Sequence, residues 1–266
     1  MPYAEEDFAP PLRWDRMSWP QLEDRREAGP RLVVLPVGAT EQHGPGLPTG
    51  TDNTIVTALT HYASGVAGVP VLPTLSFGVS VGHTHRWPGT VSLMHETLAL
   101  AVRELVAWLL ADGWDRVLLV NSHFGNDATL RTAVDRLRTD HLGKLQIGLI
   151  NTYRVSPAVW AYFIGDADDL HANRAETDLM LYLDPDACHR DTLRSGAADD
   201  DDRTAGKVFS YPVALTSTNG VTGKPSLANA ARGRELFLEM GNALADLLEY
   251  AKTETPPLTP RTSPSA

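Results

Sequence analysis

The sequence contains a single cysteine, Cys188, in 266 residues. One thiol excludes a disulfide framework within the chain and a zinc site built from cysteines. Long apolar runs are missing too, because no segment approaches the roughly 18 uninterrupted apolar residues of a membrane span. The N-terminus, MPYAEEDFAPPLRW, lacks the basic and apolar regions of a signal peptide. These absences predict a cytoplasmic protein with no membrane partner.

Basic residues are outnumbered, since 23 Lys and Arg against 33 Asp and Glu give a formal net charge of −10. This balance argues against a nucleic-acid partner, because such proteins neutralise phosphates with basic side chains. Part of the charge lies in the run Asp199 to Asp202, which is typical of a solvated loop. The chain also lacks the glycine-rich phosphate cradles of dinucleotide and nucleotide sites, so neither cofactor is predicted.

Short apolar runs typical of buried strands alternate with amphipathic segments typical of helices. Strands separated by helices imply a mostly parallel sheet with right-handed crossovers, so the sequence predicts an α/β fold. Strands are expected over residues 31–39, 69–78, 89–93, 116–122 and 144–153, and helices over 51–65, 95–113, 126–143 and 226–252, with another near 176.

No internal repeat or linker divides the chain, so we expect one domain over residues 13–252. The first 12 residues resemble a loose arm. The tail TETPPLTPRTSPSA is rich in Pro, Ser and Thr. Residues 1–12 and 253–266 are therefore expected to be flexible.

A turn-rich loop after the first predicted strand carries candidate metal ligands. LPVGATEQHGPGLPTGTD, residues 35–52, holds Glu41, His43 and Asp52 among glycines and prolines. Carboxylate oxygens and imidazole nitrogens are the usual ligands of Zn²⁺, Mn²⁺ and Fe²⁺. E-x-H alone is a weak signal, and a chance surface pair is the alternative. The position past a core strand favours function, because such loops hold functional groups on a rigid scaffold.

Two more segments add polar candidates near the same place. NSHFGN puts His123 just past another predicted strand, although a packed or solvated histidine is the alternative. Ligands of open α/β sheets bind beyond the carboxyl ends of the strands, so both loops could meet at one crevice. HANRAETDLML adds His171 and Glu176, which are five apart and cannot share a helix face. We expect His171 to precede the helix or lie on its first turn, whereas Glu176 could merely favour the helix N-terminus.

The segment GHTHRWPGTVSL offers His83, His85 and Trp87. The H-x-H pair could bind a metal, and a solvated loop is an equal alternative on spacing alone. We favour a loop that shapes a substrate pocket.

Four motifs together resemble the creatininase (creatinine amidohydrolase) family. PVGATEQHGPGLPTGTD resembles the family pattern P-x-G-S-x-E-Q-H-G-P-H-L-P-L-x-T-D, and NSHFGN resembles N-G-H-G-G-N. RWPGTVSL resembles F-P-G-T-x-S-L, and HANRAETDLML resembles H-A-G-E-x-E-T-S-x-M-L. The motifs occur in the expected order over residues 31–250, and the first is long and specific.

This resemblance implies a three-layer α/β sandwich with a dinuclear metal centre, Zn²⁺ paired with Zn²⁺, Mn²⁺ or Fe²⁺. It implies hydrolysis of cyclic or linear amides, a small-molecule amide substrate and a homo-hexamer. By the matching positions, Asp52 is a bridging ligand, His171 is the proton shuttle and Glu176 serves both as ligand and in catalysis. The implied metal ligands are Glu41, His43, Asp52, His123 and Glu176.

Departures from the pattern argue for a changed substrate. Creatininase carries a glutamate ligand two residues after the N-x-H histidine, where this chain has Gly125, so Glu176 becomes the expected ligand of the second metal. Gly46 replaces a second histidine of the first motif. Phe124 replaces a glycine and would add an apolar wall near the metals, while Arg174 could pair with a carboxylate or phosphate. The expected substrate contacts are His85, Trp87, Phe124 and Arg174.

The leading hypothesis is amide hydrolysis by metal-activated water, with His171 passing a proton to the leaving nitrogen. One alternative keeps the same centre but applies it to a peptide in a biosynthetic pathway, or to a carbon–carbon bond. A second alternative is a non-catalytic, metal-binding assembly module.

Overall fold

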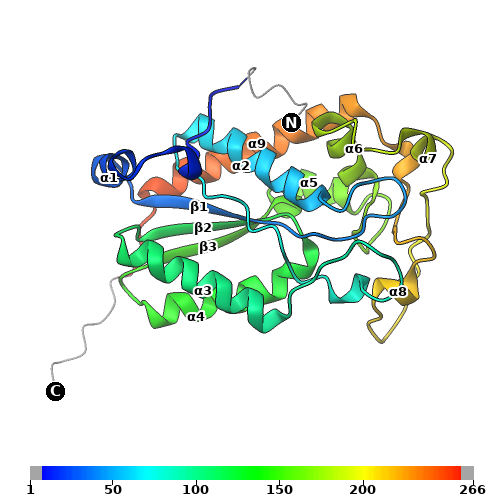
Figure 1. The fold of residues 1–266 in the computed structure, drawn as a ribbon, viewed down its shortest axis with the longest axis horizontal. Helices are drawn as coiled ribbons and strands as arrows, with labels where there is room; N and C mark the ends of the chain where they lie inside the picture. The colour runs from blue at the N-terminus through cyan, green and yellow to red at the C-terminus, as the bar shows by residue number, and fades with distance from the viewer. Residues whose placement is uncertain (1–7, 259–266) are drawn as a thin grey trace.

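The computed structural model describes residues 8–258, which form three layers (Figure 1). Parallel strands β1 (Leu32–Val37), β2 (Arg116–Asn121) and β3 (Gln146–Asn151) lie in the order β1-β2-β3. Helices α2 (Thr51–Ala67), α6 (Arg174–Leu183) and α9 (Ala230–Thr253) cover one face of the sheet, and α3 (His95–Ala111) and α4 (Asp127–Asp140) cover the other. The predicted α/β sandwich with a parallel central sheet is confirmed.

Smaller elements surround these layers. Their bounds are α1 (Trp19–Ala28), α5 (Pro157–Phe163), α7 (Arg190–Arg194) and α8 (Val213–Thr216), with 3-10 turns at Trp14–Arg16, Val81–His83, Phe124–Asn126, Thr152–Arg154 and Pro225–Leu227.

The strands are buried on both faces, which explains why they read as continuous apolar runs. In β1, Val33 and Leu35 pack in the cluster with α3 and α4, whereas Leu32 and Val34 pack in the cluster with α2, α6 and α9. Burying each such side chain contributes about 1.5–3 kcal/mol. The alternation fixes the register of β1, because a slip by one residue would exchange its two faces.

Of the predicted strands, residues 69–78 form only an irregular edge, as Pro73 indicates, and the strand over 89–93 is wrong. Residues 69–78 run beside β1 but touch it only through isolated bridges, Val71 with Val34 and Leu75 with Val37. Pro70 and Pro73 lack the N–H groups that a regular ladder needs. Residues 89–93 form no strand either, and there Gly89 adopts a φ of 103°, far from extended backbone.

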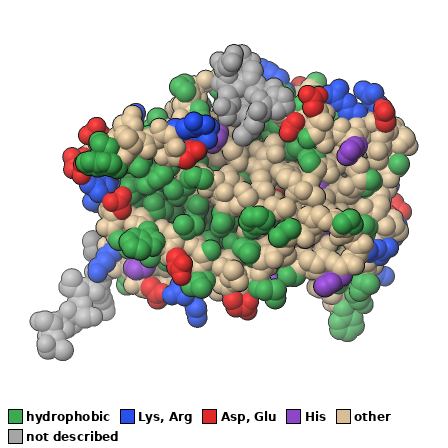
Figure 2. Space-filling model, viewed as in Figure 1, with side chains coloured by type: hydrophobic (Ala, Val, Ile, Leu, Met, Phe, Trp, Pro, Cys, Tyr) green, Lys and Arg blue, Asp and Glu red, His purple; other side chains and the backbone are tan. Residues whose placement is uncertain are grey.

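The predicted flexible ends lie partly outside the described residues. Within them, the backbone N–H of Val71 donates to Leu12 at 2.9 Å, so the arm is attached at residue 12. None of the helices in residues 8–258 has the length and apolar character needed to cross a membrane. On the face shown in Figure 2, acidic and basic side chains are interspersed, so this face carries no large field of one sign.

Candidate metal centre

The carboxyl ends of β1 and β2 point toward the part of the molecule that holds α6 and α8 (Figure 1), and polar residues follow both strands in the sequence. Glu41 and His43 follow β1, and His123 follows β2. Asp52 lies in the first turn of α2, where it points inward and is 1% exposed. The carboxyl ends of parallel strands therefore supply one crevice, as the sequence predicts.

Helix α6 brings in the remaining candidates. The Asn173 side chain caps the helix by accepting a hydrogen bond from the Glu176 backbone N–H at 3.2 Å. His171 precedes the helix, one of the two expected positions. Between them Ala172 has a φ of 51°, a left-handed conformation that is uncommon for a residue with a Cβ. This turn lets His171 and Glu176 face the same crevice although they are five residues apart.

The side chains form two groups of three that share Asp52. One group is Glu41, Asp52 and His123, and the other is His43, Asp52 and Glu176. Within each group the ligand-type atoms lie within 4.8 Å of one another. All five side chains belong to residues no more than 8% exposed. The structure thus brings together all five residues that the sequence offers as ligands.

Three buried oxygens in this cluster have no hydrogen-bond partner among the described residues: both oxygens of Glu41 and Oδ2 of Asp52. Burying a carboxylate without a hydrogen bond or an opposite charge costs several kcal/mol of stability, because the group loses its hydration. Divalent cations between these oxygens would supply that compensation. The residues therefore fit a metal centre.

The orientations of two histidine rings also support a metal centre. His43 Nδ1 lies 3.0 Å from the Glu41 carbonyl, and His123 Nε2 lies 2.8 Å from the Val79 carbonyl. A carbonyl only accepts, so each of these nitrogens carries the proton. The other nitrogen of each ring faces Asp52, at 3.7 Å from His43 and 3.1 Å from His123. A lone pair facing a carboxylate needs either a cation or a second proton between them.

The charges in the cluster favour that second proton when no cation is present. Burial by itself lowers the pKa of His43, but the charges of Asp52 and Glu176 outweigh burial and raise the pKa to about 10. For His123, burial likewise lowers the pKa, while Glu41 and Asp52 raise it to about 9. Metal binding at neutral pH would therefore displace protons from both rings.

A third group of possible ligands consists of Glu41, His83 and His171. Nε2 of His83 and Nδ1 of His171 each lie 3.1 Å from Oε1 of Glu41. The other ring nitrogen of His171 lies 2.8 Å from the Gln42 carbonyl and therefore carries the proton. In the sequence, His83 was favoured as part of a pocket loop, with an H-x-H metal pair as an alternative, and Gln42 was not singled out.

Buried amides brace the strand ends behind these ligands. Nδ2 of Asn126 donates to the Gly38 carbonyl at 3.0 Å and to Oδ1 of Asn121 at 3.1 Å. Oδ1 of Asn126 accepts from the Val79 N–H at 2.8 Å. Asn126 is the N-cap residue of α4, but its side chain makes these long-range contacts and does not cap the helix. The network holds the Val79 carbonyl that orients His123.

A cavity of about 220 Å³ opens onto this cluster. Its walls include Glu41, His83, His123, His171 and, as predicted, Phe124. Phe124 is 49% exposed and packs near Tyr153, so it forms an apolar wall.

Three predicted substrate contacts lie outside the cavity lining. His85 is exposed and has a φ of 75°. Trp87 stacks with the Arg86 guanidinium, 5.1 Å from the ring centre. Arg174 stacks over Tyr162 at 4.7 Å. The structure therefore gives none of these side chains a direct place in the cavity.

Gly125 explains why this chain has no glutamate after His123. A Cβ at position 125 would lie 2.3 Å from the Val79 carbonyl oxygen and 2.6 Å from His123 Nε2. No side chain fits there without moving the loop. Glu176, from a different element, takes the place beside His43 and Asp52.

Ser80 raises a rival chemistry that the sequence interpretation missed. It lies in GVSVG, residues 78–82, which matches the G-x-S-x-G pattern of serine hydrolases. Ser80 Oγ lies 3.2 Å from His123 Nε2, on the ring that also faces Asp52. That nitrogen already donates to Val79, however, so it cannot accept the serine proton. Ser80 is also not at a strand-to-α-helix turn, as a nucleophile elbow requires, because no regular strand precedes it and only the 3-10 turn Val81–His83 follows it.

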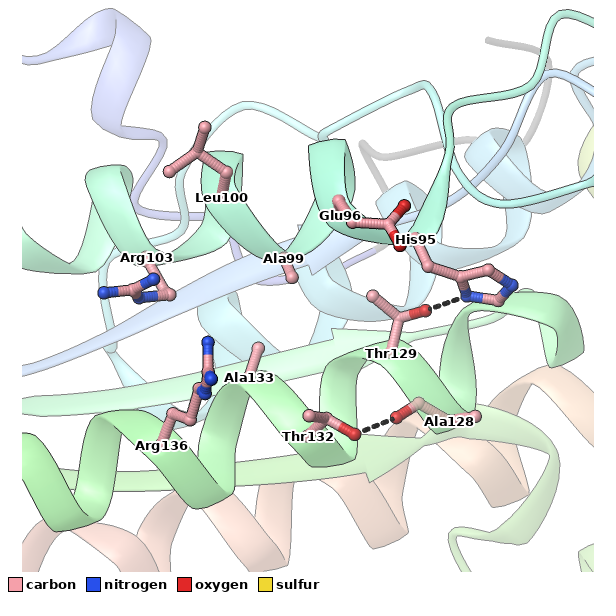
Figure 3. Close-up of a pocket in the computed structure, with 10 residues that line it drawn as sticks. All are labelled: His95, Glu96, Ala99, Leu100, Arg103, Ala128, Thr129, Thr132, Ala133 and Arg136. Carbon is pink, nitrogen blue, oxygen red and sulfur yellow. Dashed lines mark hydrogen bonds between the residues drawn. The ribbon is translucent and has the colours of Figure 1, made fainter.

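A second hollow, a groove of about 580 Å³, runs between α3 and α4 (Figure 3). His95 lines both the groove and the cavity, so the two hollows adjoin at this residue. Thr129 holds the His95 ring through a hydrogen bond of 2.6 Å. Arg103 and Arg136 lie at the opposite end of the groove.

The fold and the cluster define an α/β protein with a histidine–carboxylate site of metal-binding type. The profile of the creatininase family, described as creatinine amidohydrolase, matches residues 15–248. The chain belongs to the creatininase family and is a divergent member of this group of hydrolases.

Individual relatives carry different activities. The chain is 33% identical over 225 residues to a mycofactocin precursor peptide peptidase of Mycolicibacterium smegmatis, covering 82% of this chain and 84% of that protein. It is 28% identical over 261 residues to a creatinine amidohydrolase of Pseudomonas putida, covering 91% of this chain and 96% of that protein.

Solved structures give the same fold. A creatininase variant of Zn–Zn type superposes with a TM-score of 0.77, and a manganese creatininase with 0.76. Each is 25% identical, and each comparison covers 92% of this chain, with 99% and 100% of the two solved chains. Divalent metal use by these relatives agrees with the carboxylate–histidine groups of this chain.

Proposed function

We propose that this protein is a dinuclear metal-dependent amidohydrolase that cleaves a C–N bond with a metal-activated water. The observation that carries the proposal is the pair of ligand groups that share Asp52, with three unpartnered buried oxygens between them. Zn²⁺ paired with Zn²⁺, Mn²⁺ or Fe²⁺ suits this donor set. Assembly as a homo-hexamer and a single domain over 13–252 stay predictions.

The chain's own residues divide the work. Glu41 and His123 would hold one cation and His43 and Glu176 the other, with Asp52 belonging to both groups. Such cations lower the pKa of a bound water and polarise a carbonyl. His171 keeps its Nε2 proton on the Gln42 carbonyl, so Nδ1 is the atom that takes a proton from water and returns it to the leaving nitrogen.

A linear peptide is the second candidate substrate, and two observations favour it over creatinine. The 33% identical relative is named as a peptide peptidase. The groove that adjoins the cavity at His95 extends along α3 to Arg103, about 12 Å at 1.5 Å per residue. That length accommodates about four extended residues, and the guanidinium groups at its end suit an acidic group.

The test begins with metal content per chain, measured by plasma mass spectrometry on wild type and on Asp52→Ala. We expect about two ions in wild type, the number needed for two-metal chemistry, and loss of both in the variant. Metal-loaded protein is then assayed with creatinine, lactams, formamides, cyclic ketones and short peptides. Bound metal with no turnover of any class would instead support the assembly-module alternative.

The peptide candidate has its own test. If the groove binds the substrate, Arg103→Ala and Arg136→Ala raise KM for a peptide with an acidic group about four residues from the cleaved bond. The matched neutral peptide should be unaffected. Equal effects of both variants on the two peptides would exclude this use of the groove.

A further inference from the structure

Gln42 has a side-chain amide whose orientation is determined by its neighbours. Its Oε1 accepts from the Gly44 N–H at 2.9 Å, and its Nε2 donates to the Gly220 carbonyl at 3.1 Å. Turning the amide over would place N–H against N–H at Gly44 and oxygen against oxygen at Gly220. The orientation of the Gln42 amide is therefore fixed, with its NH₂ group facing the crevice.

This amide determines which nitrogen of His83 carries the proton. Nε2 of Gln42 lies 3.0 Å from Nδ1 of His83 and 3.1 Å from Nε2 of His171. The His171 nitrogen already donates to the Gln42 carbonyl, so it cannot accept. The second amide proton of Gln42 therefore goes to Nδ1 of His83, which has no proton of its own. The proton of the neutral ring must be on Nε2. That N–H lies 3.1 Å from Oε1 of Glu41, on the wall of the cavity. With its lone pair already used, His83 cannot complete a third cation site with Glu41 and His171.

His83 and His171 therefore present a hydrogen-bond donor and an acceptor, respectively, to the same part of the cavity. Their ring centres are 4.2 Å apart, and both line the cavity. His171 offers an unprotonated Nδ1, whereas His83 offers an N–H. An oxygen that gains negative charge during amide hydrolysis is stabilised by such a fixed donor.

We propose that His83 is a catalytic residue whose Nε2–H, held by Gln42, donates a hydrogen bond to the scissile carbonyl oxygen. The inference rests on the proposed amide hydrolysis. Gln42 is itself held by Gly44 and Gly220, so the tautomer of His83 is fixed before substrate binds. The N–H that faces Oε1 of Glu41 would be shared with the substrate oxygen. Removal of one donor of this kind lowers kcat by about 100- to 1,000-fold.

The first experiment compares His83→Ala and His83→Gln with the control His189→Gln, which changes an exposed histidine. The glutamine amide nitrogen can occupy the place of the imidazole Nε2. We expect His83→Ala to lower kcat by about 100-fold with KM little changed, His83→Gln to recover much of it, and the control to match wild type. Metal content should be the same in all four proteins. Loss of one ion per chain in His83→Ala, or unchanged kcat, would overturn the inference.

The second experiment does not depend on turnover. The ¹⁵N resonances of histidine in labelled, metal-loaded wild type are assigned to His83 by comparison with His83→Gln. A protonated Nε2 and an unprotonated Nδ1 support the proposed donor, and the reverse overturns it. If wild type hydrolyses no amide, the proposed function fails and the role of His83 toward a substrate fails with it, whatever its tautomer.

Discussion

Oδ2 of Asp52 lies 3.1 Å from Nδ1 of His123, at the end of a ring whose other nitrogen is fixed by a backbone carbonyl. The second oxygen of the same carboxylate faces His43. One side chain therefore serves both groups of ligands, and neither group is complete without it.

Asp52→Asn is the sharpest test of this bridge, because it keeps the shape and removes the charge. We expect both ions to be lost, since an amide nitrogen facing an imidazole lone pair and a cation cannot act as a ligand. Metal content per chain measures the effect. Asp191→Asn, the same change at an exposed position, is the control. Retention of one tightly held ion would mean that the two positions do not share a ligand.

The pH dependence of stability should have opposite signs with and without metal. In the metal-free protein, protonated His43 and His123 stabilise the fold fully below their ordinary pKa of 6.5. That contribution is lost as pH rises through about 9 and about 10. Metal binding requires unprotonated rings and so strengthens as pH rises. The difference in melting temperature between metal-loaded and chelated protein should grow between pH 6.5 and pH 9. A constant difference would contradict the assignment of these rings as ligands.

Gly125→Ala should damage the centre without touching a ligand. Its Cβ would push the Val79 carbonyl away from His123, and overpacking of this kind costs about 1–3 kcal/mol. We expect weaker metal binding and a lower melting temperature. Gly206→Ala is the control for the loss of a glycine, since a Cβ there meets no atom within 4 Å although its φ is 70°. Wild-type metal affinity in Gly125→Ala would show that the loop yields easily.

Ser80→Ala distinguishes the metal mechanism from a serine nucleophile. Because His123 Nε2 already donates to Val79, we expect Ser80→Ala to retain most of its activity. Loss of a serine nucleophile lowers kcat by about 10⁶-fold in a triad enzyme. The measurement is kcat for whichever amide wild type hydrolyses. A collapse of kcat with metal content intact would favour the serine.

Local pattern was sufficient for the three regular strands and the long helices, while the resemblance to a family supplied the five clustered side chains. Strands buried on both faces produce unbroken apolar runs, and Glu41, His43 and His123 each follow such a run directly. The pattern failed where the burial of a residue depends on partners that are distant in the sequence. Asp200 was expected to be solvated, yet it is 7% exposed because Ser217 and Thr218 donate to its carboxylate.

The roles of Gln42 and His83 could not be predicted for the same reason. Gln42 is oriented by the Gly220 carbonyl, 178 residues away in the sequence. Arg174 was expected in the pocket because of its position in a motif, but Tyr162 provides an aromatic face that draws it aside. The spacing of residues in the sequence does not show that Gly220 lies beside Gln42 or that Tyr162 lies beside Arg174.

A metal-holding carboxylate shared by both groups would also tie the amount of folded protein to the metal supply of the cell. The ligands come from separate parts of the chain and meet only when α6 is in place, so an unfolded chain has no equivalent site. Free metal at 100 times its dissociation constant would stabilise the native state by about 2.7 kcal/mol. A chain made under metal starvation would lack this contribution and would be the form that cellular proteases remove first.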